Sequence, residues 1–299
     1  MEPRAPEYVH QEAFEWPVAL YLYLGGMGGA LISLGVILNF FRLGASLSVL
    51  AAFSGIVALA VAGVVLIFFD LVRPLNAIYS LSRFPHSGIS WDVVLLSLAA
   101  LFGLLFSLPQ VVIWPGFSFW RGLAQILAPW QGFLGLVAFL SGALFPLVSG
   151  GLLAEPVSIP LWHTPALPLL MIETSYSAAL AWITLFEAVP TSLGNVFWGI
   201  NLALLTLTAA TVFSYQQYVK HGPREAQASG LLLARQPSFT VGYLGLGLVL
   251  PLVLAAWNVF AAGPLSLVNP VAGAGILVGG YLLRHHLVYA GIYTYPWPY

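Results

Sequence analysis

Acidic and basic side chains gather in one short stretch of an otherwise apolar chain. In FFDLVRPLNAIYSLSRFPHSGISW, residues 68–91, Asp70 and Arg73 directly follow a long hydrophobic run and lie one helical turn apart. Residues at this spacing face each other on a helix, so the two side chains can form an ion pair. The stretch indicates either a simple ion pair at a membrane surface or a polar path that leads from water to a buried site.

Asp92 begins the next apolar run, close to the same predicted surface. The dipole of a helix stabilises a carboxylate near the helix N-terminus, and this effect alone would explain an acid at that position. The alternative is that Asp92 belongs to the polar path.

Glu173 lies in LPLLMIETSYSAALAW, residues 167–182, near the middle of a predicted span. An ionisable group at such a depth costs a few kcal/mol, so it needs a partner or a function. We expect Glu173 either to relay protons together with the hydroxyls of the following TSYS, or to stay protonated and bond to a neighbouring helix.

The last apolar run ends in LRHHL, which contains Arg284, His285 and His286. Adjacent residues on a helix point about 100° apart, so the two imidazoles do not face one ligand. The other histidines fall in predicted loops or at helix ends, whereas a membrane haem b needs ligands within spans. We therefore expect no haem, and Arg284 joins the candidate polar path.

The composition indicates that membrane helices position these groups. Of the 299 residues, 60% are hydrophobic and 6% are charged, and the mean hydropathy is +0.93. Soluble domains carry about 25% charged residues, so lipid is the expected solvent. The net charge of −1 argues against nucleic acid as a partner, because phosphate binding needs a basic excess. The chain has no cysteine, so it cannot form a disulfide or hold a thiolate-bound iron–sulfur cluster.

Eight apolar runs are long enough to cross a bilayer, which takes roughly 20 residues per helix. They are predicted at residues 17–41, 46–69, 90–113, 127–150, 161–184, 194–217, 239–262 and 267–290. The predicted fold is all-α, a polytopic membrane protein with about eight transmembrane helices in two packed bundles. A polar N-terminal arm, 1–16, precedes a single transmembrane domain, 17–299. No metal-ligand cluster and no nucleophile–base arrangement stands out, so no catalytic or metal-binding residue is predicted.

The first run contains YLYLGGMGGALISLG, in which Gly25 and Gly29 are four residues apart. Small residues at that spacing let two helix backbones approach closely. The same lack of side chains would also leave room for a flat ligand, and both interpretations stay open.

Four segments resemble the NrfD/PsrC-like proteins in order and spacing. They are WPVALYLYLGGMGGA (16–30), FFDLVRPLNAIY (68–79), HSGISW (86–91) and SGGLLAEPVSIPLWHTPALPLL (149–170). The resemblance covers residues 14–185, and the last three spans match by hydropathy. Members of this family are membrane subunits of polysulfide, thiosulfate, tetrathionate and nitrite reductase-type complexes.

The resemblance implies a quinone-binding anchor subunit in the cell (cytoplasmic) membrane. Its cofactor would be menaquinone or another quinone, with no haem and no iron–sulfur cluster in this chain. The implied partners, besides the lipid membrane, are a ferredoxin-like subunit with four iron–sulfur clusters and a large molybdopterin-type catalytic subunit. Electrons would pass between the quinone pool and the iron–sulfur subunit, with proton translocation as a further expectation.

By the same resemblance, the quinone pocket lies between the start of the first span, the loop after Asp70 and the fourth span. The implied quinone-binding residues are Trp16, Tyr21, Arg73, Ser87, Trp91 and His163, with Tyr21 and His163 as donors to the quinone carbonyls. The residues assigned to proton transfer are Asp70, Asp92, Glu173 and Arg284.

This chain departs from the family pattern at several positions. Val148 stands where relatives often carry Tyr, His163 where they carry Asn, and Asp92 where they carry Gly. We expect His163 to supply the donor that Val148 lacks, since an imidazole also donates to a carbonyl and carries protons.

Two other functions stay open. A transporter or proton channel would use Asp70, Arg73, Glu173 and Arg284, and a purely structural anchor would handle no quinone.

The side of the membrane that the termini face is also open. An even number of spans places both termini on one side, and the positive-inside rule makes that side cytoplasmic. In many relatives, however, the termini face outward with the catalytic subunits.

Overall fold

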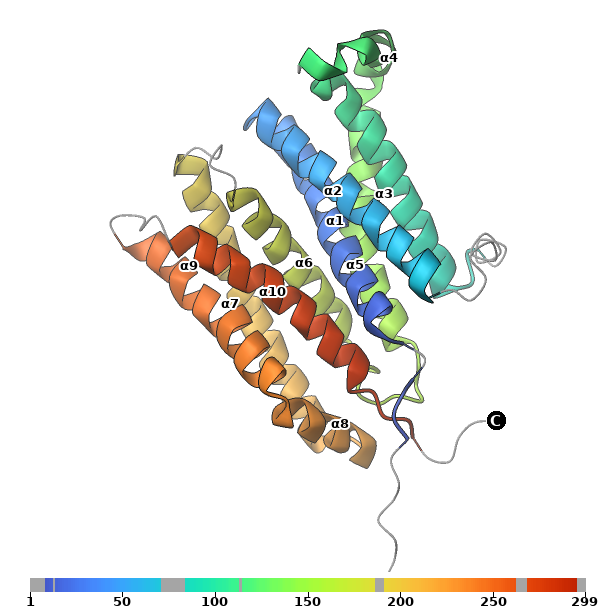
Figure 1. Ribbon diagram of the computed structural model, residues 1–299, viewed down its shortest axis with the longest axis vertical. Helices are drawn as coiled ribbons and strands as arrows, with labels where there is room; N and C mark the ends of the chain where they lie inside the picture. Colours follow the sequence, from blue (N-terminus) through green and yellow to red (C-terminus); the bar gives the residue numbers. More distant parts are fainter. Residues whose placement is uncertain are drawn as a thin grey trace, which may run out of the picture.

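The computed structural model describes residues 9–12, 14–70, 84–112, 115–185, 191–261 and 268–294. Within these ranges, every long secondary-structure element is a helix (Figure 1). The elements are α1 (Trp16–Phe40), α2 (Ala45–Val65) with a π-helical end (Leu66–Asp70), α3 (Gly88–Val111), α4 (Arg121–Leu127), α5 (Gln131–Ala154), α6 (Ala166–Thr184), α7 (Thr191–His221), α8 (Arg224–Arg235), a π-helix (Ser238–Val249) that continues as α9 (Leu250–Phe260), and α10 (Val268–Tyr289).

Eight helical spans in the described residues have the length and hydropathy needed to cross a membrane, which confirms the predicted all-α membrane fold. The starts of two spans differ most from the prediction. The fourth span extends over Gly116–Ala154 because α4 and short 3₁₀ turns precede α5. The fifth span begins at Ala166 rather than 161, after a turn that ends at Pro165, a residue suited to a helix start.

The short helix α8 was not predicted. Its sequence REAQASGLLLAR is too polar and too short for a span, but it has a strongly amphipathic pattern. Such a helix suits the boundary between lipid and water.

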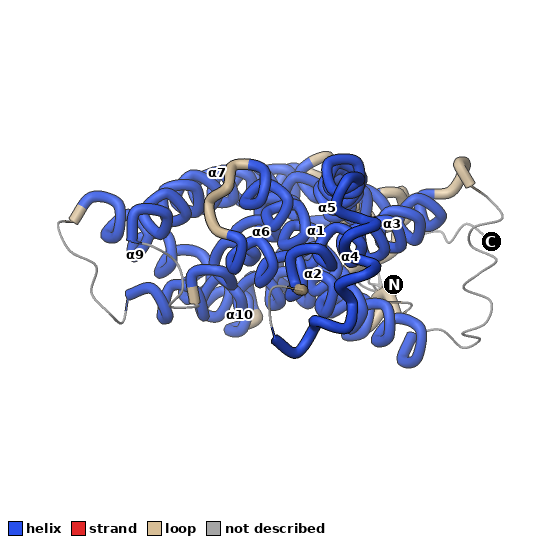
Figure 2. The backbone as a smooth tube through the Cα atoms, turned by 90° about the horizontal axis from the view of Figure 1, so that it is seen from above, coloured by secondary structure: helices blue, strands red, loops and turns tan. Residues whose placement is uncertain are grey.

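The spans form two groups of four. Helices α1, α2, α3 and α5 pack together, as do α6, α7, α10 and the span that ends in α9. The groups meet where α1 and α5 contact α6, and where α1 contacts α10. Figure 2, which views the helices from above, shows the two groups side by side across the width of the molecule. The described helices therefore have the two-bundle arrangement that the sequence predicted.

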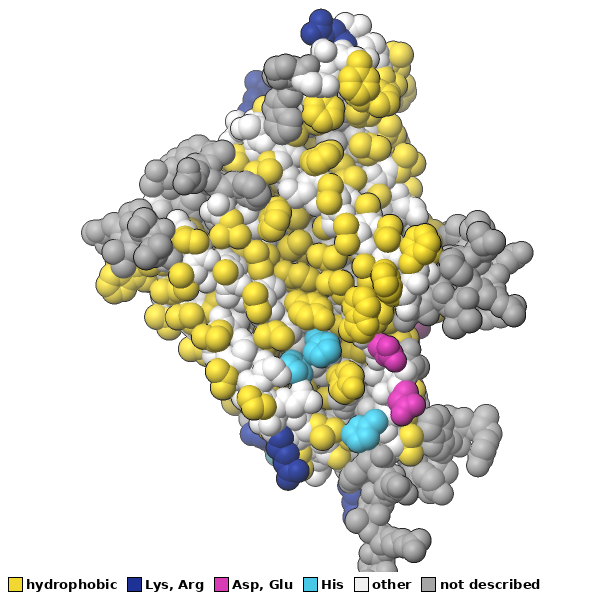
Figure 3. All heavy atoms as spheres, viewed as in Figure 1, with side chains coloured by type: hydrophobic (Ala, Val, Ile, Leu, Met, Phe, Trp, Pro, Cys, Tyr) yellow, Lys and Arg dark blue, Asp and Glu magenta, His cyan; other side chains and the backbone are white. Residues whose placement is uncertain are grey.

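The exterior of the helical region is apolar. Large hydrophobic side chains such as Phe68, Leu136, Phe213 and Val278 are more than half exposed. On the face in Figure 3, hydrophobic side chains cover the middle of the bundle, whereas Lys and Arg lie toward its two ends. An apolar band of this kind is what lipid tails would cover. The protein is a multi-pass membrane protein.

Glycines let α1 touch two neighbours backbone to backbone. A Cβ added at Gly29 would lie 2.6 Å from the carbonyl oxygen of Gly142 on α5, and one at Gly28 would lie 2.8 Å from that of Gly55 on α2. Real Cβ contacts are not that short, so these positions leave no room for a side chain. The packing interpretation of the glycine-rich first span is confirmed for these two contacts.

Segments from the two ends of the chain pair with each other. Gln11 N donates to Gly291 O at 3.0 Å, and Tyr293 N donates to Val9 O at 3.0 Å. The buried Gln11 side chain also donates to Val288 O at 2.9 Å. The end of the bundle that carries this pairing is called the terminal end below; the N-termini of α1 and α3 and the C-termini of α5, α7 and α10 lie toward it.

We predict that Gly29→Val lowers stability by about 1–3 kcal/mol, because overpacking would force α1 and α5 apart. Thermal unfolding of the purified protein in detergent measures this. Gly63→Val is the matched control, since a Cβ at Gly63 on α2 meets nothing within 4 Å. Equal melting temperatures for the two variants would contradict the prediction.

Candidate functional site

A hydrogen-bonded cluster of Tyr21, Asp92 and Ser149 joins three helices near the terminal end. The Tyr21 hydroxyl donates to Asp92 Oδ2, and the Ser149 hydroxyl donates to Asp92 Oδ1. The three residues come from α1, α3 and α5, and their exposed fractions are 5%, 2% and 2%. The carboxylate is therefore enclosed and has a hydroxyl donor on each oxygen. We call this set the Asp92 cluster.

The local sequence explains the position of each member. Tyr21 lies a little over one turn into α1, which begins at Trp16 with proline next, and Asp92 is the fifth residue of α3. Ser149 lies one turn and a half before the C-terminus of α5. The Tyr21 ring also packs edge-on against Phe145, one turn before Ser149, with ring centroids 6.1 Å apart. Helices α1 and α3 begin, and α5 ends, at the same end of the bundle, so the three polar groups lie at one level.

The structure joins residues that the sequence assigned to different roles. Tyr21 was assigned to quinone binding and Asp92 to proton transfer, yet they bond directly. The helix-dipole explanation of Asp92 is incomplete, because its side chain lies inside the bundle and is held by two other helices.

Most other residues assigned to the quinone pocket lie at or near the surface of the terminal end. The Trp16 ring packs on Phe69 at 5.6 Å, and the Trp91 ring packs on Phe84 at 4.7 Å. Trp16 and Trp91 are 43% and 41% exposed. Ser87 is partly buried and precedes α3, where its carbonyl accepts from the backbone of the first helical turn.

His163 lies on the segment between α5 and α6 and is exposed. Its Nδ1 is 3.0 Å from Ala154 O, so the ring is tied to the end of α5. This bond does not link it to the Asp92 cluster. Arg73 and the side chain of Asp70 lie outside the described residues, so the predicted ion pair between them stays a prediction.

Arg284 is fully buried on α10 and ties three helices together. Its guanidinium donates to Leu22 O at 3.2 Å on α1, to Met171 O at 3.2 Å on α6 and to Gly280 O at 2.9 Å on its own helix. It also donates to the Ser175 hydroxyl at 2.7 Å and lies 5.5 Å from the Tyr23 ring centre. Among the described residues none of its bonds goes to a carboxylate, so carbonyls and a hydroxyl solvate the cation.

Three side chains of the TSYS patch after Glu173 bond to three neighbouring helices, whereas Thr174 donates to Leu170 O on its own helix. Ser175 accepts from Arg284 on α10, and Tyr176 is 3.0 Å from Ser33 on α1. Ser177 donates to Asn201 on α7 at 2.9 Å. The patch therefore connects the two groups of spans at membrane depth.

Glu173 is 4% exposed and lies in the middle part of α6, as predicted. Thr211 on α7 donates to its Oε1 at 3.0 Å, so the expected bond to a neighbouring helix is present. Its Oε2 is buried without a hydrogen-bond partner among the described residues. The relay role of Glu173 stays a prediction.

The two histidines of LRHHL lie in different surroundings, as their spacing predicts. His285 stacks on Tyr281 and Tyr289, each at 5.8 Å, whereas His286 is buried against Phe239 at 5.7 Å. No group of three His, Cys, Asp or Glu residues suited to a metal ion occurs within the part of the chain that the structure describes.

Sequence reasoning missed Ser149 and Thr211 as partners of the two buried acids. Both are hydroxyl residues within apolar spans, a type that usually bonds to its own helix backbone. The only signal was the presence of an acid on another span that required a donor.

We predict an interaction free energy of about 1.5–3 kcal/mol between Tyr21 and Asp92, the range for hydrogen bonds to charged groups. A double-mutant cycle of Tyr21→Phe and Asp92→Asn, followed by thermal unfolding in detergent, measures it. As control, Tyr21→Phe combined with Gln110→Leu should be additive, because Gln110 bonds instead to Ser48 and Phe106. Additivity in the first cycle would contradict the geometry.

Comparison with known proteins identifies the family to which the chain belongs. A family profile described as "Polysulphide reductase, NrfD" matches residues 5–296. The C subunit of the polysulfide reductase of Wolinella succinogenes is 27% identical over 314 residues, which cover 95% of this chain and 96% of that protein. Protein NrfD of Escherichia coli is 26% identical over 328 residues, which cover 94% of this chain and 95% of that protein. The resemblance read from the four sequence segments is thus confirmed along nearly the whole length, and the chain belongs to the NrfD family of polysulphide reductase membrane proteins.

Proposed function

We propose that this chain is the quinone-binding membrane subunit of a multi-subunit oxidoreductase and that the Asp92 cluster is part of its quinone site. In this proposal, electrons pass between the membrane quinone pool and a ferredoxin-like iron–sulfur subunit. That subunit exchanges them with a large molybdopterin-type catalytic subunit. The observation that carries the proposal is a buried carboxylate that holds two hydroxyl donors near one end of a membrane domain of the NrfD family.

The residues of the Asp92 cluster fit a quinone. A quinone is flat and apolar apart from two carbonyl oxygens, so its site needs an apolar slot and one or two hydroxyl or N–H donors. The cluster offers the Tyr21 hydroxyl, which would turn from Asp92 to a quinone carbonyl once Oδ2 is protonated, and Phe145 supplies an aromatic edge beside Tyr21. Trp16 with Phe69 and Trp91 with Phe84 add aromatic surface at the same end.

A bound quinone supplies the two-electron, two-proton couple, and the protein must deliver or remove the protons. Tyr21 would donate its hydroxyl hydrogen to a carbonyl oxygen, and Asp92 Oδ2 would hold a proton that replaces it. Ser149 would fix the other carboxylate oxygen, so that Oδ2 keeps its direction toward Tyr21. We propose that Asp70 and Arg73 carry protons between the Asp92 cluster and water.

The terminal end is where we propose that the iron–sulfur partner docks. The paired chain ends form a fixed platform there, held by Gln11 and by Trp162, whose indole N–H donates to Leu287 O at 2.7 Å. The exposed Glu155 and His163 lie on the same end. A partner seated there would bring an electron donor or acceptor close to the level of the Asp92 cluster.

Glu173 and Arg284 are proposed to serve proton movement deeper in the membrane. Both are buried. Glu173 on α6 accepts a hydrogen bond from Thr211 on α7, and Arg284 on α10 donates to Ser175 on α6. Oε2 of Glu173, which has no hydrogen-bond partner among the described residues, is a position where a proton or a water would be held. This part of the proposal stands apart from quinone binding and has its own test.

We predict that Tyr21→Phe and Asp92→Asn each lower quinol-linked turnover by about 10²-fold, the usual contribution of a proton donor or acceptor. Turnover of the purified complex is measured with a quinol and, separately, with an artificial dye that bypasses the membrane subunit. Dye-linked activity should be unchanged. Tyr289→Phe is the matched control, since Tyr289 is exposed at 61% on α10. Wild-type quinol-linked turnover in both variants would leave a structural anchor as the function.

The partners are tested by the same preparation. Mass spectrometry of the gently purified complex should identify a cysteine-rich iron–sulfur subunit and a large molybdopterin-type subunit. Reproducible isolation of the chain alone would contradict the proposal.

For Glu173, we predict that Glu173→Gln abolishes proton uptake coupled to quinol turnover and keeps most of the turnover itself. The amide has nearly the same shape and still accepts from Thr211, but it cannot carry a proton. Proton movement is followed with a pH-sensitive dye in sealed liposomes that contain the complex. Full coupling in Glu173→Gln would rule out the relay.

A further inference from the structure

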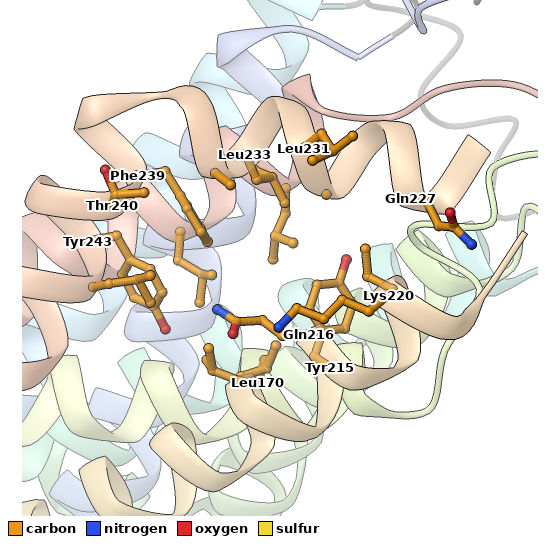
Figure 4. Close-up of a pocket in the computed structure, with 17 residues that line it drawn as sticks. Leu170, Tyr215, Gln216, Lys220, Gln227, Leu231, Leu233, Phe239, Thr240 and Tyr243 are labelled. Carbon is orange, nitrogen blue, oxygen red and sulfur yellow. The ribbon is translucent and has the colours of Figure 1, made fainter. Parts of the chain in front are cut away.

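A cavity of about 450 Å³ lies in the second group of spans, apart from the Asp92 cluster. The C-terminal part of α7, the amphipathic helix α8, the π-helix Ser238–Val249 and α10 line it, and α6 contributes Leu170 (Figure 4). Its size is within the range of small-molecule sites. We call it the α8 cavity.

The lining of the α8 cavity is mainly apolar, with polar groups from α7, α8 and the π-helix. Leu170, Val212, Leu244, Leu283 and Leu287 form an aliphatic part. Gln216 and Lys220 extend from α7 into the space between the helices, and Gln227 lies on α8 at the far side (Figure 4). The cavity is thus amphiphilic, with one cation and no carboxylate among its lining residues.

Helix periodicity organises these polar groups by depth. Gln216 and Lys220 are four residues apart on α7, so they lie on one face and about 6 Å apart along the axis. Lys220 is in the last turn of α7, and we expect the lipid headgroups at this end of the span. The α7 positions 212 and 216 lead from that level toward the membrane interior on the same face.

The polar groups of the cavity have unused bonding capacity. Neither Lys220 nor Gln216 has a side-chain hydrogen bond or an ion pair within the described ranges. Lys220 and Gln216 can therefore bind polar groups of a ligand that enters the cavity.

We propose that the α8 cavity binds one anionic glycerophospholipid. The phosphate would bind Lys220, a glycerol ester carbonyl one turn deeper would accept from the Gln216 amide, and an acyl chain would lie along Val212, Leu244 and Leu283. The second acyl chain would leave past Leu231, an exposed lining residue of α8. Basic pockets between membrane helices on a headgroup surface are suited to anionic lipids.

The charge of the surrounding surface favours an anion over a neutral amphiphile. Lys220 and Arg224 flank the turn between α7 and α8, and Arg235 ends α8. Glu225 is the only acid on α8. An uncharged quinone would use the aliphatic part of the cavity but would have no use for this cationic rim.

Native mass spectrometry of the delipidated complex, titrated with phosphatidylglycerol or phosphatidylcholine, tests the proposal. We expect one phosphatidylglycerol per chain, bound at least about tenfold more tightly than phosphatidylcholine, because the trimethylammonium of phosphatidylcholine offsets its phosphate and is repelled by the cationic rim. Lys220→Ala should remove this preference. Arg121→Ala, which deletes a cation at the opposite end, should preserve it. Equal binding of both lipids by the unaltered protein, or an unchanged preference in Lys220→Ala, would overturn the proposal.

A second variant tests the cavity without touching the cation. Ala234→Trp places a bulky side chain on an exposed lining position of α8, so the fold should tolerate it. We expect it to abolish binding of the one tight phosphatidylglycerol. Lipid binding that survives this change would overturn the assignment to the α8 cavity. So would a co-purified quinone that Ala234→Trp removes and phosphatidylglycerol does not displace.

Discussion

The bilayer interior offers no water to buried polar groups, so a polar side chain inside the bundle is costly unless another part of the protein bonds to it. This constraint determines how the helices are joined. Asp92 on α3 receives one hydroxyl from α1 and one from α5, and the guanidinium of Arg284 on α10 reaches carbonyls on α1 and α6. The polar residues that could do chemistry are thus also the ones that hold the helices in register.

The apolar packing makes those polar contacts attainable. Gly28 and Gly29 bring α1 into backbone contact with α2 and α5, so Tyr21 on α1 lies close enough to reach a carboxylate on α3. The same helix carries Leu22, which accepts from Arg284 across the boundary between the two groups of spans. Helix α1 therefore connects the Asp92 cluster to the second group of spans, as does α5 through its contacts with α6.

Much of the fold follows from local sequence, because apolar runs of span length have few alternatives in a membrane. The mid-span position of Glu173 was predictable for that reason. The bond between Tyr21 and Asp92 was not, since it joins residues that are 71 positions apart and depends on how α1 and α3 pack. Ser149 carries no local signal at all. The α8 cavity depends on a helix whose polar sequence reads as a loop, and only the packed structure shows that it covers an apolar space.

The central claim is that quinone is handled at the Asp92 cluster. Photolabelling of the intact complex with an azido-quinone, followed by peptide mapping, tests it most directly. We predict label in peptides that contain the start of α1, the start of α3 or the end of α5, and less label when Tyr21 is changed to Phe. Label confined to peptides of α7, α8 and the π-helix would instead assign the quinone to the α8 cavity and contradict the account.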